Sequence, residues 1–281
     1  MESLKFSFVF LLLFQFTGCG SFSTDEIVKE DTSRDLNTTT TIIDVEDNES
    51  LEIDKNDTLP ISTPIAELNK TIELDNFIND INCDQVIEKE FSTGSLLSIC
   101  YDYGYKSSIY VGYTLDGTLI NSVNIEERPN FYTETEIPSE YQVLYSDYTG
   151  SGYDRGHLAP DADFDYNEED LDLIYTLANI IPQDPNVNRY FWIKAEYQER
   201  LVAASLGELS VINGVVFDEN PSYIGENEIA ISKAFWKILY NDEKEFRQCY
   251  YYNNYVLEDA DEDTLAKHLV DCNSLIIGAD E

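Results

Sequence analysis

Apolar runs rich in β-branched and aromatic residues are spread over the last two thirds of the chain, and each predicts a strand. The clearest runs lie at 96–101, 109–115, 209–217, 234–240 and 248–252. Asp116-Gly117 directly follows the second run and has the composition of a tight turn. Helical signals are fewer and lie at 188–206, which ends at Gly207, and at 264–272. Strands on both sides of a central helix, without regular alternation of strand and helix, predict an α+β fold with a mostly antiparallel sheet.

The first 18 residues have the pattern of a targeting segment. The run Phe6–Phe16 is apolar except for Ser7 and Gln15, and it is shorter than the roughly 20 residues that a spanning helix needs. It ends in Phe16-Thr17-Gly18-Cys19, which resembles the lipobox of bacterial lipoproteins, although Phe16 replaces the usual leucine-like residue. We therefore expect a signal peptide over 1–18 and a lipid on Cys19. Ordinary cleavage with release, or an uncleaved anchor, are the alternatives.

Residues 19–74 are rich in Thr, Ser, Asn, Asp and Glu, and no apolar period persists in them. Such a composition is typical of a flexible acidic spacer with no binding role of its own. The composition becomes globular from about Asp75, so we expect a tether over 19–74 and one folded domain over 75–281.

The charge of the chain restricts its function. With 55 acidic and 17 basic side chains the formal net charge is −38, yet 43% of the residues are hydrophobic. The apolar share excludes a wholly disordered acidic protein. The acidity argues against a broad basic surface for nucleic acid, because phosphate groups are neutralised by Lys and Arg. Only local clusters, such as Arg128, Arg155, Arg189, Lys194 and Arg200, could bind phosphate.

The cysteines fit an oxidising compartment. Apart from Cys19 there are four, and four cysteines allow three pairings. We expect the local pairs Cys83–Cys100 and Cys249–Cys272, because each lies within one short segment. Neither pair has the Cys-x-x-Cys spacing of zinc sites.

The chain has two histidines. His157 stands in Asp154-Arg155-Gly156-His157, beside a cation and a carboxylate, and so has the surroundings of a general base. A loop histidine held by hydrogen bonds is the alternative. His268, on the second expected helix, is interpreted as a surface residue.

Four polar or aromatic residues recur at a spacing of four on the first expected helix: Asn188, Trp192, Glu196 and Arg200. They share one helical face, and a face with an amide, a carboxylate and a cation fits a helix that lines a site. An exposed flank on which Glu196 pairs with Arg200 explains the pattern equally well.

Two other patterns are interpreted as structural. Asp161-x-Asp163-x-Asp165 resembles the start of a calcium loop, but Tyr166 replaces the glycine that such a loop requires. The 20 tyrosines occur mainly in runs and are interpreted as strand surface and core.

Together these segments resemble the DNA/RNA non-specific endonucleases of the ββα-metal (His-Me finger) group, which includes mitochondrial endonuclease G. The resemblance covers about Cys83 to the end and implies a ββα-metal nuclease fold, with helices flanking a central sheet. It rests on Asp154-Arg155-Gly156-His157, Asn179 with Pro182-Gln183, and Asn188, Trp192 and Glu196, with Arg128 and Phe131 upstream.

The resemblance also implies roles for single residues. His157 is the expected general base, because a neutral imidazole accepts a proton at neutral pH. Asn188 is expected to be the sole direct protein ligand of one Mg²⁺, for which Mn²⁺ could substitute, and Glu196 to bind that ion through water.

The other implied roles concern phosphate and orientation. Arg128, Arg155 and Arg200 are the expected phosphate clamps, because the guanidinium fork matches paired phosphate oxygens. Asn179 is expected to orient the site rather than to react.

The resulting hypothesis is an exported, Mg²⁺-dependent endonuclease that acts on DNA, RNA or both and leaves 5′-phosphates. The enzyme would act on nucleic acid in the periplasm, at the cell surface or after secretion. The lipid on Cys19 would hold it at the membrane. The alternative, from another class, is an acidic exported binding lipoprotein on a degenerate nuclease scaffold. Intact His157, Asn188 and Glu196 argue against that alternative.

Overall fold

The computed structural model describes residues 57–61, 81–255 and 263–277. The expected signal peptide 1–18, Cys19 and the expected tether, except for Asp57–Ile61, lie outside these residues. None of the helices in the described ranges is long and apolar enough to cross a membrane.

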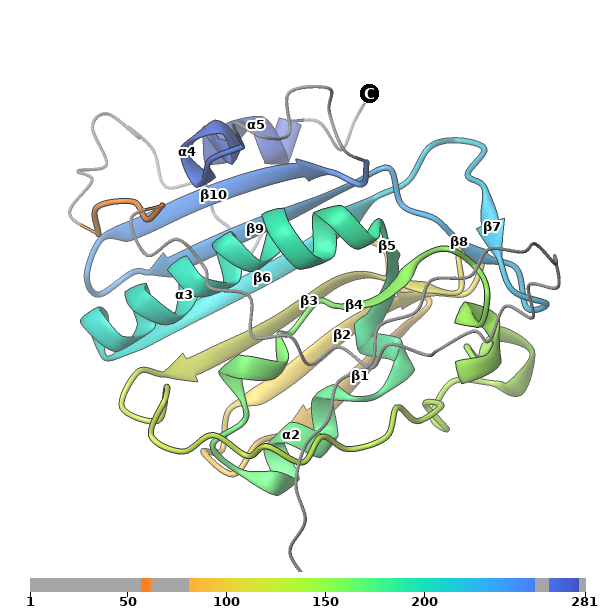
Figure 1. Ribbon diagram of the computed structural model, residues 1–281, viewed down its shortest axis with the longest axis horizontal. Coiled ribbons are helices and arrows are strands. Elements are labelled where there is room, and N and C mark those ends of the chain that lie inside the picture. The colour runs from red at the N-terminus through yellow and green to blue at the C-terminus, as the bar shows by residue number, and fades with distance from the viewer. Residues whose placement is uncertain (1–56, 62–80, 256–262, 278–281) are drawn as a thin grey trace, which may run out of the picture. The chain divides into compact units, whose positions relative to one another are not determined.

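A seven-stranded sheet forms the centre of the domain (Figure 1). Every pairing in it is antiparallel, as the sequence predicts. In spatial order the strands are β1 (Gln85–Glu90), β2 (Leu96–Asp102), β3 (Ser107–Asp116), β6 (Glu208–Val216), β9 (Ala234–Asn241), β10 (Phe246–Asn253) and β11 (Leu269–Val270). The five long apolar runs thus become β2, β3, β6, β9 and β10, since a strand inside a sheet buries side chains on both faces.

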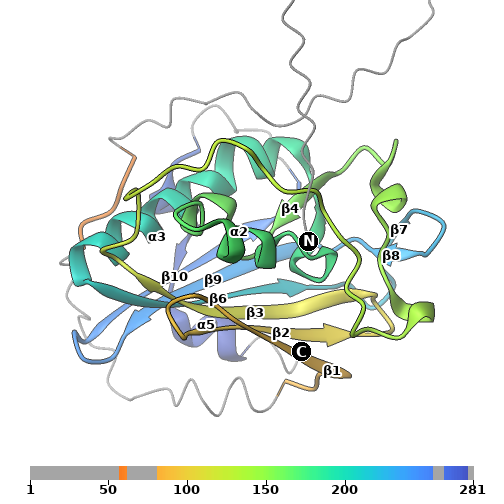
Figure 2. The same cartoon turned by 90° about the horizontal axis from the view of Figure 1, so that it is seen from below.

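Helices cover the sheet unequally. Strand β4 and helices α2 (Glu168–Ile174) and α3 (Ile193–Leu206) lie over one face, whereas α5 (Cys272–Ile277) lies over the other (Figure 2). A π-helical turn, Val187–Trp192, runs directly into α3, so together they occupy the range that the sequence predicts. Gly207 ends α3 with a φ of 88°, a conformation that side chains other than glycine rarely adopt.

Two small sheets and several short turns complete the fold. The first sheet pairs β4 (Asp154–His157) with β5 (Ile180–Gln183), and the second pairs β7 (Tyr223–Ile224) with β8 (Ile229–Ala230). The 3₁₀ turns are η1 (Ser139–Tyr141), η2 (Tyr145–Tyr148), η3 (Asp161–Asp163) and η4 (Leu177–Asn179).

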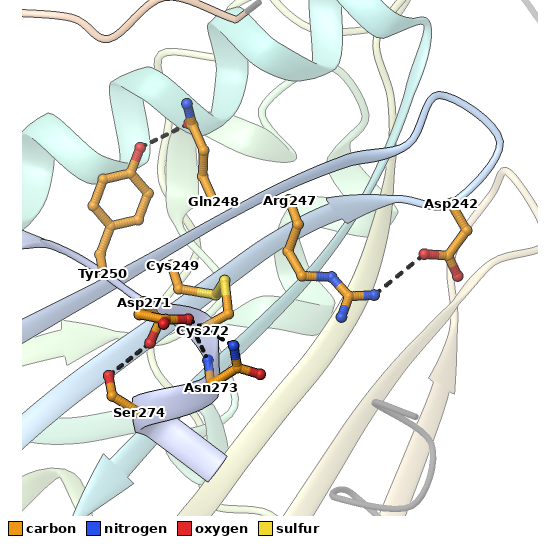
Figure 3. The surroundings of a disulfide bond; sticks show 9 residues. All are labelled: Asp242, Arg247, Gln248, Cys249, Tyr250, Asp271, Cys272, Asn273 and Ser274. Carbon is orange, nitrogen blue, oxygen red and sulfur yellow. Dashed lines mark hydrogen bonds and ion pairs between the residues drawn. A yellow bond between two sulfur atoms is a disulfide. The ribbon is translucent and has the colours of Figure 1, made fainter. Parts of the chain in front are cut away.

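Both expected disulfides, Cys83–Cys100 and Cys249–Cys272, are present. They lie on the sheet face away from α3, in a cluster with Ile212, Trp236 and Ile238. Figure 3 shows the second bond, which joins β10 to the start of α5.

The prediction of one helix over 264–272 is wrong. The segment forms a short helix α4 (Leu265–His268), then β11 beside β10, and Cys272 already begins α5. The unpaired edge of β10 and the disulfide to Cys249 compete with helix formation, and the backbone of Leu269 and Val270 bonds to the sheet instead.

His268 is likewise not a simple surface residue. Its ring stacks on Tyr252 with centroids 3.7 Å apart, and its Nε2 lies 2.8 Å from Asp263 Oδ2. The sequence pattern around His268 contains no signal for these two contacts.

Residues Asp57–Ile61, within the expected tether, contact α3. The Leu59 amide donates to Gln198 Oε1 at 3.0 Å, and Gln198 Nε2 donates back to the Leu59 carbonyl at 2.9 Å. Asp57 Oδ2 lies 3.0 Å from Lys194 Nζ. This short stretch is therefore held against the helix by both backbone and side-chain contacts.

Candidate active site

Two short strands and a helix carry the residues singled out in the sequence. They are Asp154-Arg155-Gly156-His157 (the DRGH segment) and the predicted helix face of Asn188, Trp192, Glu196 and Arg200. In the β4–β5 pair, Asp154 lies opposite Gln183 and His157 opposite Ile180. The π-helical turn and α3 follow β5 after three residues. Gly156 is required here, because a Cβ at that position would lie 2.1 Å from Gln183 Oε1. This explains in steric terms why glycine separates Arg155 from His157.

His157 is held between two aromatic rings. Its ring centroid lies 5.4 Å from that of Phe131 and 4.9 Å from that of Tyr175. The ring is partly exposed, but its Nε2 atom is buried and has no hydrogen-bond partner within the described ranges. Burial lowers the pKa of His157 to about 4, against the opposing effect of Asp161 and with the help of Arg128. The imidazole is therefore neutral over the physiological range, and one of its two ring nitrogens can accept a proton.

Asp154 connects β4 with the first turn of the following helix. Its Oδ2 accepts from Asn188 Nδ2 at 3.1 Å and from Arg189 Nε at 2.8 Å, and its Oδ1 accepts from Arg189 Nη2 at 2.7 Å. The bond from Nδ2 sets the amide orientation of Asn188, so its carbonyl oxygen is the atom left for a ligand. The sequence pattern predicts neither contact of Asp154, and it groups Arg189 with the cations that could bind phosphate.

Glu196 lies eight residues after Asn188, in α3, on the helical segment that continues the π-helical turn. Burial raises the pKa of Glu196 to about 7; Lys237 and Arg200 lower it, whereas Glu199 and Asp161 raise it further. A carboxylate and an amide oxygen on one continuous helical segment are the oxygen donors that a hard divalent cation prefers.

The predicted arginines differ in their surroundings. Arg128 pairs with Asp161 at 2.8 Å and with Asp165 at 3.4 Å, and its side chain is 32% exposed. Arg155 Nη2 donates to the Tyr145 hydroxyl at 2.9 Å. Arg128 and Arg155 therefore keep partly accessible guanidinium groups close to His157.

Arg200 lies deeper. Only 8% of it is exposed, and its Nη1 donates to Oδ1 of the buried Asp163 at 3.0 Å. The three aspartates of the calcium-like pattern thus all serve as arginine partners. The Arg200 side chain is thus less accessible than that of Arg128, and the clamp roles of Arg128, Arg155 and Arg200 stay predictions.

Comparison with known proteins identifies the family. Residues 79–275, well over half of the chain, match the model of the family described as DNA/RNA non-specific endonuclease. The chain belongs to this family. Human mitochondrial endonuclease G is 27% identical over 151 residues, 50% of this chain and 51% of that protein. A nuclease of Nostoc sp. is 29% identical over 143 residues, with the same coverage of 50% and 51%.

The chain thus spans about half the length of these curated relatives. A chain in the crystal structure of the EndoG/EndoGI complex has the same fold, with a TM-score of 0.62 at 18% identity, over 75% of this chain and 91% of that chain. The expected ββα-metal nuclease fold is confirmed by this likeness and by the succession β4, β5, α3.

Asn179 has structural contacts in this endonuclease-family domain. Its Nδ2 donates to the carbonyls of Ala159 and Ile174, its Oδ1 accepts from the Ala159 amide, and its own carbonyl accepts from Leu158. The side chain and backbone of Asn179 therefore hold the two residues that follow His157.

A buried polar network lies behind the site of this family member. The fully buried Lys237 donates to Glu199 Oε2, and the Tyr113 hydroxyl donates to Glu199 Oε1. Asn213 Nδ2 donates to the Tyr113 hydroxyl at 2.9 Å and also to the Leu158 carbonyl. Sequence reasoning missed this network, although a lysine inside the apolar run 234–240 was a signal for it.

Proposed function

We propose that the protein is an exported, Mg²⁺-dependent endonuclease that hydrolyses DNA, RNA or both without sequence specificity and leaves 5′-phosphates. The observation that carries this proposal is the neutral imidazole of His157, held by Phe131 and Tyr175, with Arg128 close enough to affect its pKa. Family membership and relatives named as nucleases support it.

In this proposal, the unprotonated ring nitrogen of His157 accepts a proton from water. The water oxygen then attacks phosphorus, the bond to the 3′-oxygen breaks, and that oxygen takes a proton from solvent water, so that 5′-phosphate and 3′-hydroxyl ends separate. The rings of Phe131 and Tyr175 keep the imidazole in place and desolvated. Because its orientation is fixed, the imidazole is already in place to accept the proton when water and phosphate bind.

Asn188 and Glu196 would hold the cation, the first directly and the second through water. When bound, Mg²⁺ supplies positive charge that stabilises the developing charge on the phosphate and on the leaving oxygen. Asp154 orients the amide of Asn188 by accepting its Nδ2–H. Arg128 and Arg155 would bind non-bridging phosphate oxygens next to His157.

The deciding experiment is degradation of plasmid DNA and of RNA by the purified protein with Mg²⁺, with Mn²⁺ and with EDTA. We expect cleavage with either metal and none in EDTA. Folded protein that binds nucleic acid but never cleaves it would instead support the alternative of a binding lipoprotein.

Export and the lipid anchor are part of the proposal and are supported by the sequence of residues 1–19. A single acyl chain binds membranes weakly, whereas several chains anchor stably. Fractionation of cells that express wild type or Cys19→Ala tests the anchor. Wild type should be found with membranes and the variant in the soluble fraction, and equal release of both would refute the anchor.

A further inference from the structure

Tyr145 is a large exposed ring at the edge of the candidate active site. It begins the turn η2, and 48% of it is exposed. Its hydroxyl accepts a hydrogen bond from Arg155 Nη2 at 2.9 Å, and the Arg155 Cζ atom lies 4.2 Å from its ring centroid. The guanidinium thus orients the aromatic ring through a hydrogen bond and a cation–π contact.

The ring is connected to His157 by contacts between neighbouring side chains. The Phe131 centroid lies 6.5 Å from Tyr145, 5.4 Å from Arg155 Cζ and 5.4 Å from the His157 ring. Arg155 and His157 are two residues apart on β4, so their side chains project to the same side of that strand. Tyr145, Arg155 and Phe131 therefore continue the surface that begins at His157.

Other tyrosines are as exposed, including Tyr190 at 49% on the π-helical turn Val187–Trp192. Tyr223, for example, is 51% exposed and belongs to the small β7–β8 sheet. Tyr145 is distinguished by its bond to an arginine of the DRGH segment. An exposed aromatic ring beside a guanidinium is the combination that binds single nucleotides, since the ring stacks on the base and the cation binds the phosphate.

We propose that Tyr145 and Arg155 form a subsite for one nucleotide next to the cleaved phosphodiester, with the base stacked on Tyr145 and its phosphate on Arg155. This inference rests on the proposed function. Every base has a π face, so the subsite accepts all four bases, as a non-specific enzyme requires. Stacking also does not depend on net charge, so it provides affinity for a polyanion in a protein with a net charge of −38.

The test compares Tyr145→Ala, Tyr145→Phe and the control Tyr223→Ala on a single-stranded oligonucleotide whose cleavage is mapped bond by bond. Loss of stacking should raise KM and reduce kcat/KM of Tyr145→Ala by about 5- to 100-fold. Tyr145→Phe, which keeps the ring but not the hydroxyl, should stay within about threefold of wild type, and so should Tyr223→Ala.

An abasic nucleotide, moved one position at a time along the oligonucleotide, separates stacking from support of Arg155. At one position next to the cleaved bond, wild type should lose the advantage over Tyr145→Ala that it has on the intact strand. Equal cleavage by wild type and Tyr145→Ala on intact strands, or an undiminished difference at every abasic position, would overturn the subsite.

Binding of the same oligonucleotide to the variants, followed by fluorescence anisotropy in EDTA, keeps the two proposals distinguishable. If wild type never cleaves but still binds more tightly than Tyr145→Ala, the proposed function fails and the subsite stands. If wild type cleaves, and Tyr145→Ala binds and cleaves the oligonucleotide as well as wild type does, the subsite fails and the function stands.

Discussion

The two faces of the central sheet bury different kinds of side chain. Beneath α5 the interior is apolar and cross-linked, with Ile212, Trp236 and Ile238 packed around both disulfides. Beneath α3 the interior includes the ion pair Lys237–Glu199 and the carboxylate of Asp163. Trp236 and Lys237 are adjacent on β9, so one strand supplies both kinds of interior simply by alternating its side chains.

The difference indicates what each face contributes. Two disulfides and apolar packing stabilise the α5 face. Buried charges on the α3 face must be paired to be tolerated, and such pairs are weak sources of net stability. Here they connect α3 to the backbone next to His157, through Glu199, Tyr113 and Asn213. We infer that the charged face serves the site and the cross-linked face stabilises the scaffold.

The largest effect should come from the α3 face. His157→Ala should reduce kcat/KM for DNA by about 10²- to 10⁴-fold without unfolding the domain, because a positioned proton acceptor is lost. His268→Ala removes the other histidine and serves as the control, with activity near wild type. Activity of His157→Ala close to wild type would contradict the assignment of the base.

The same base determines the acid limit of activity. His157 is neutral above its pKa of about 4, which is lowered by burial, and becomes protonated as the pH falls through that value. At Mg²⁺ concentrations that saturate the cation site and so keep Glu196 ionised despite its pKa of about 7, we expect kcat/KM to persist well below pH 6.5 and to fall near pH 4. A fall of kcat/KM near pH 6.5 would show that the His157 ring is solvated in the working enzyme.

Asn188 tests the cation site on this face. Asn188→Ala should reduce turnover by about 10²-fold or more, since the direct oxygen ligand is lost. Asn188→Asp keeps an oxygen but puts a second carboxylate against Asp154, which now accepts from Nδ2 at 3.1 Å. Calorimetry should show Mg²⁺ binding retained or tighter in that variant while turnover falls. Full activity of Asn188→Ala in EDTA would contradict the site.

The buried ion pair should decide the stability of the α3 face. Lys237→Met leaves Glu199 buried without its cation, and we expect a loss of about 3–5 kcal/mol in the free energy of unfolding. The double variant Lys237→Met with Glu199→Gln removes both charges and should recover part of that loss. Urea denaturation measures the stability of both variants. An unchanged midpoint for Lys237→Met would show that the ion pair does not contribute to the free energy of unfolding.

Smaller stability effects are expected on the α5 face, with no effect on catalysis. Replacing Cys249 and Cys272 by serine should cost about 3 kcal/mol, and replacing Cys83 and Cys100 nearly the same, since loop entropy depends only weakly on length. The two loops have sequence separations of 23 and 17. Cleavage per folded molecule at 25 °C should stay at the wild-type value. A large drop would contradict the inference that the α5 face contributes to stability and not to catalysis.

Ionic strength should have the smallest effect and the opposite sign to that of a basic nucleic-acid-binding protein. Screening of a net charge of −38 weakens repulsion of a polyanion. We expect kcat/KM for linear DNA to rise by about two- to tenfold as NaCl increases from about 10 to about 150 mM at constant Mg²⁺. A steep fall would indicate that a local basic surface dominates the encounter.

The sequence alone determined the features that depend on neighbouring residues. Long apolar runs predicted β2, β3, β6, β9 and β10, and helical spacing predicted the range 188–206. It missed β1, whose edge-strand residues are mostly polar, and also β4 and β5, whose four residues each are too few to show a period. The DRGH segment located the histidine of the site without showing that it lies on a strand.

The tertiary structure alone decided the partners that lie far apart in the chain. Asp154 and Asn188 are 34 residues apart, Glu199 and Lys237 are 38, and Leu158 and Asn213 are 55. No local propensity encodes such pairs, because a buried charge or amide satisfies its hydrogen bonds with whichever group the packing brings close. For the same reason the helix expected over 264–272 does not form as one piece. Leu269 and Val270 pair with the edge of β10 instead, and Cys272 is bonded to Cys249.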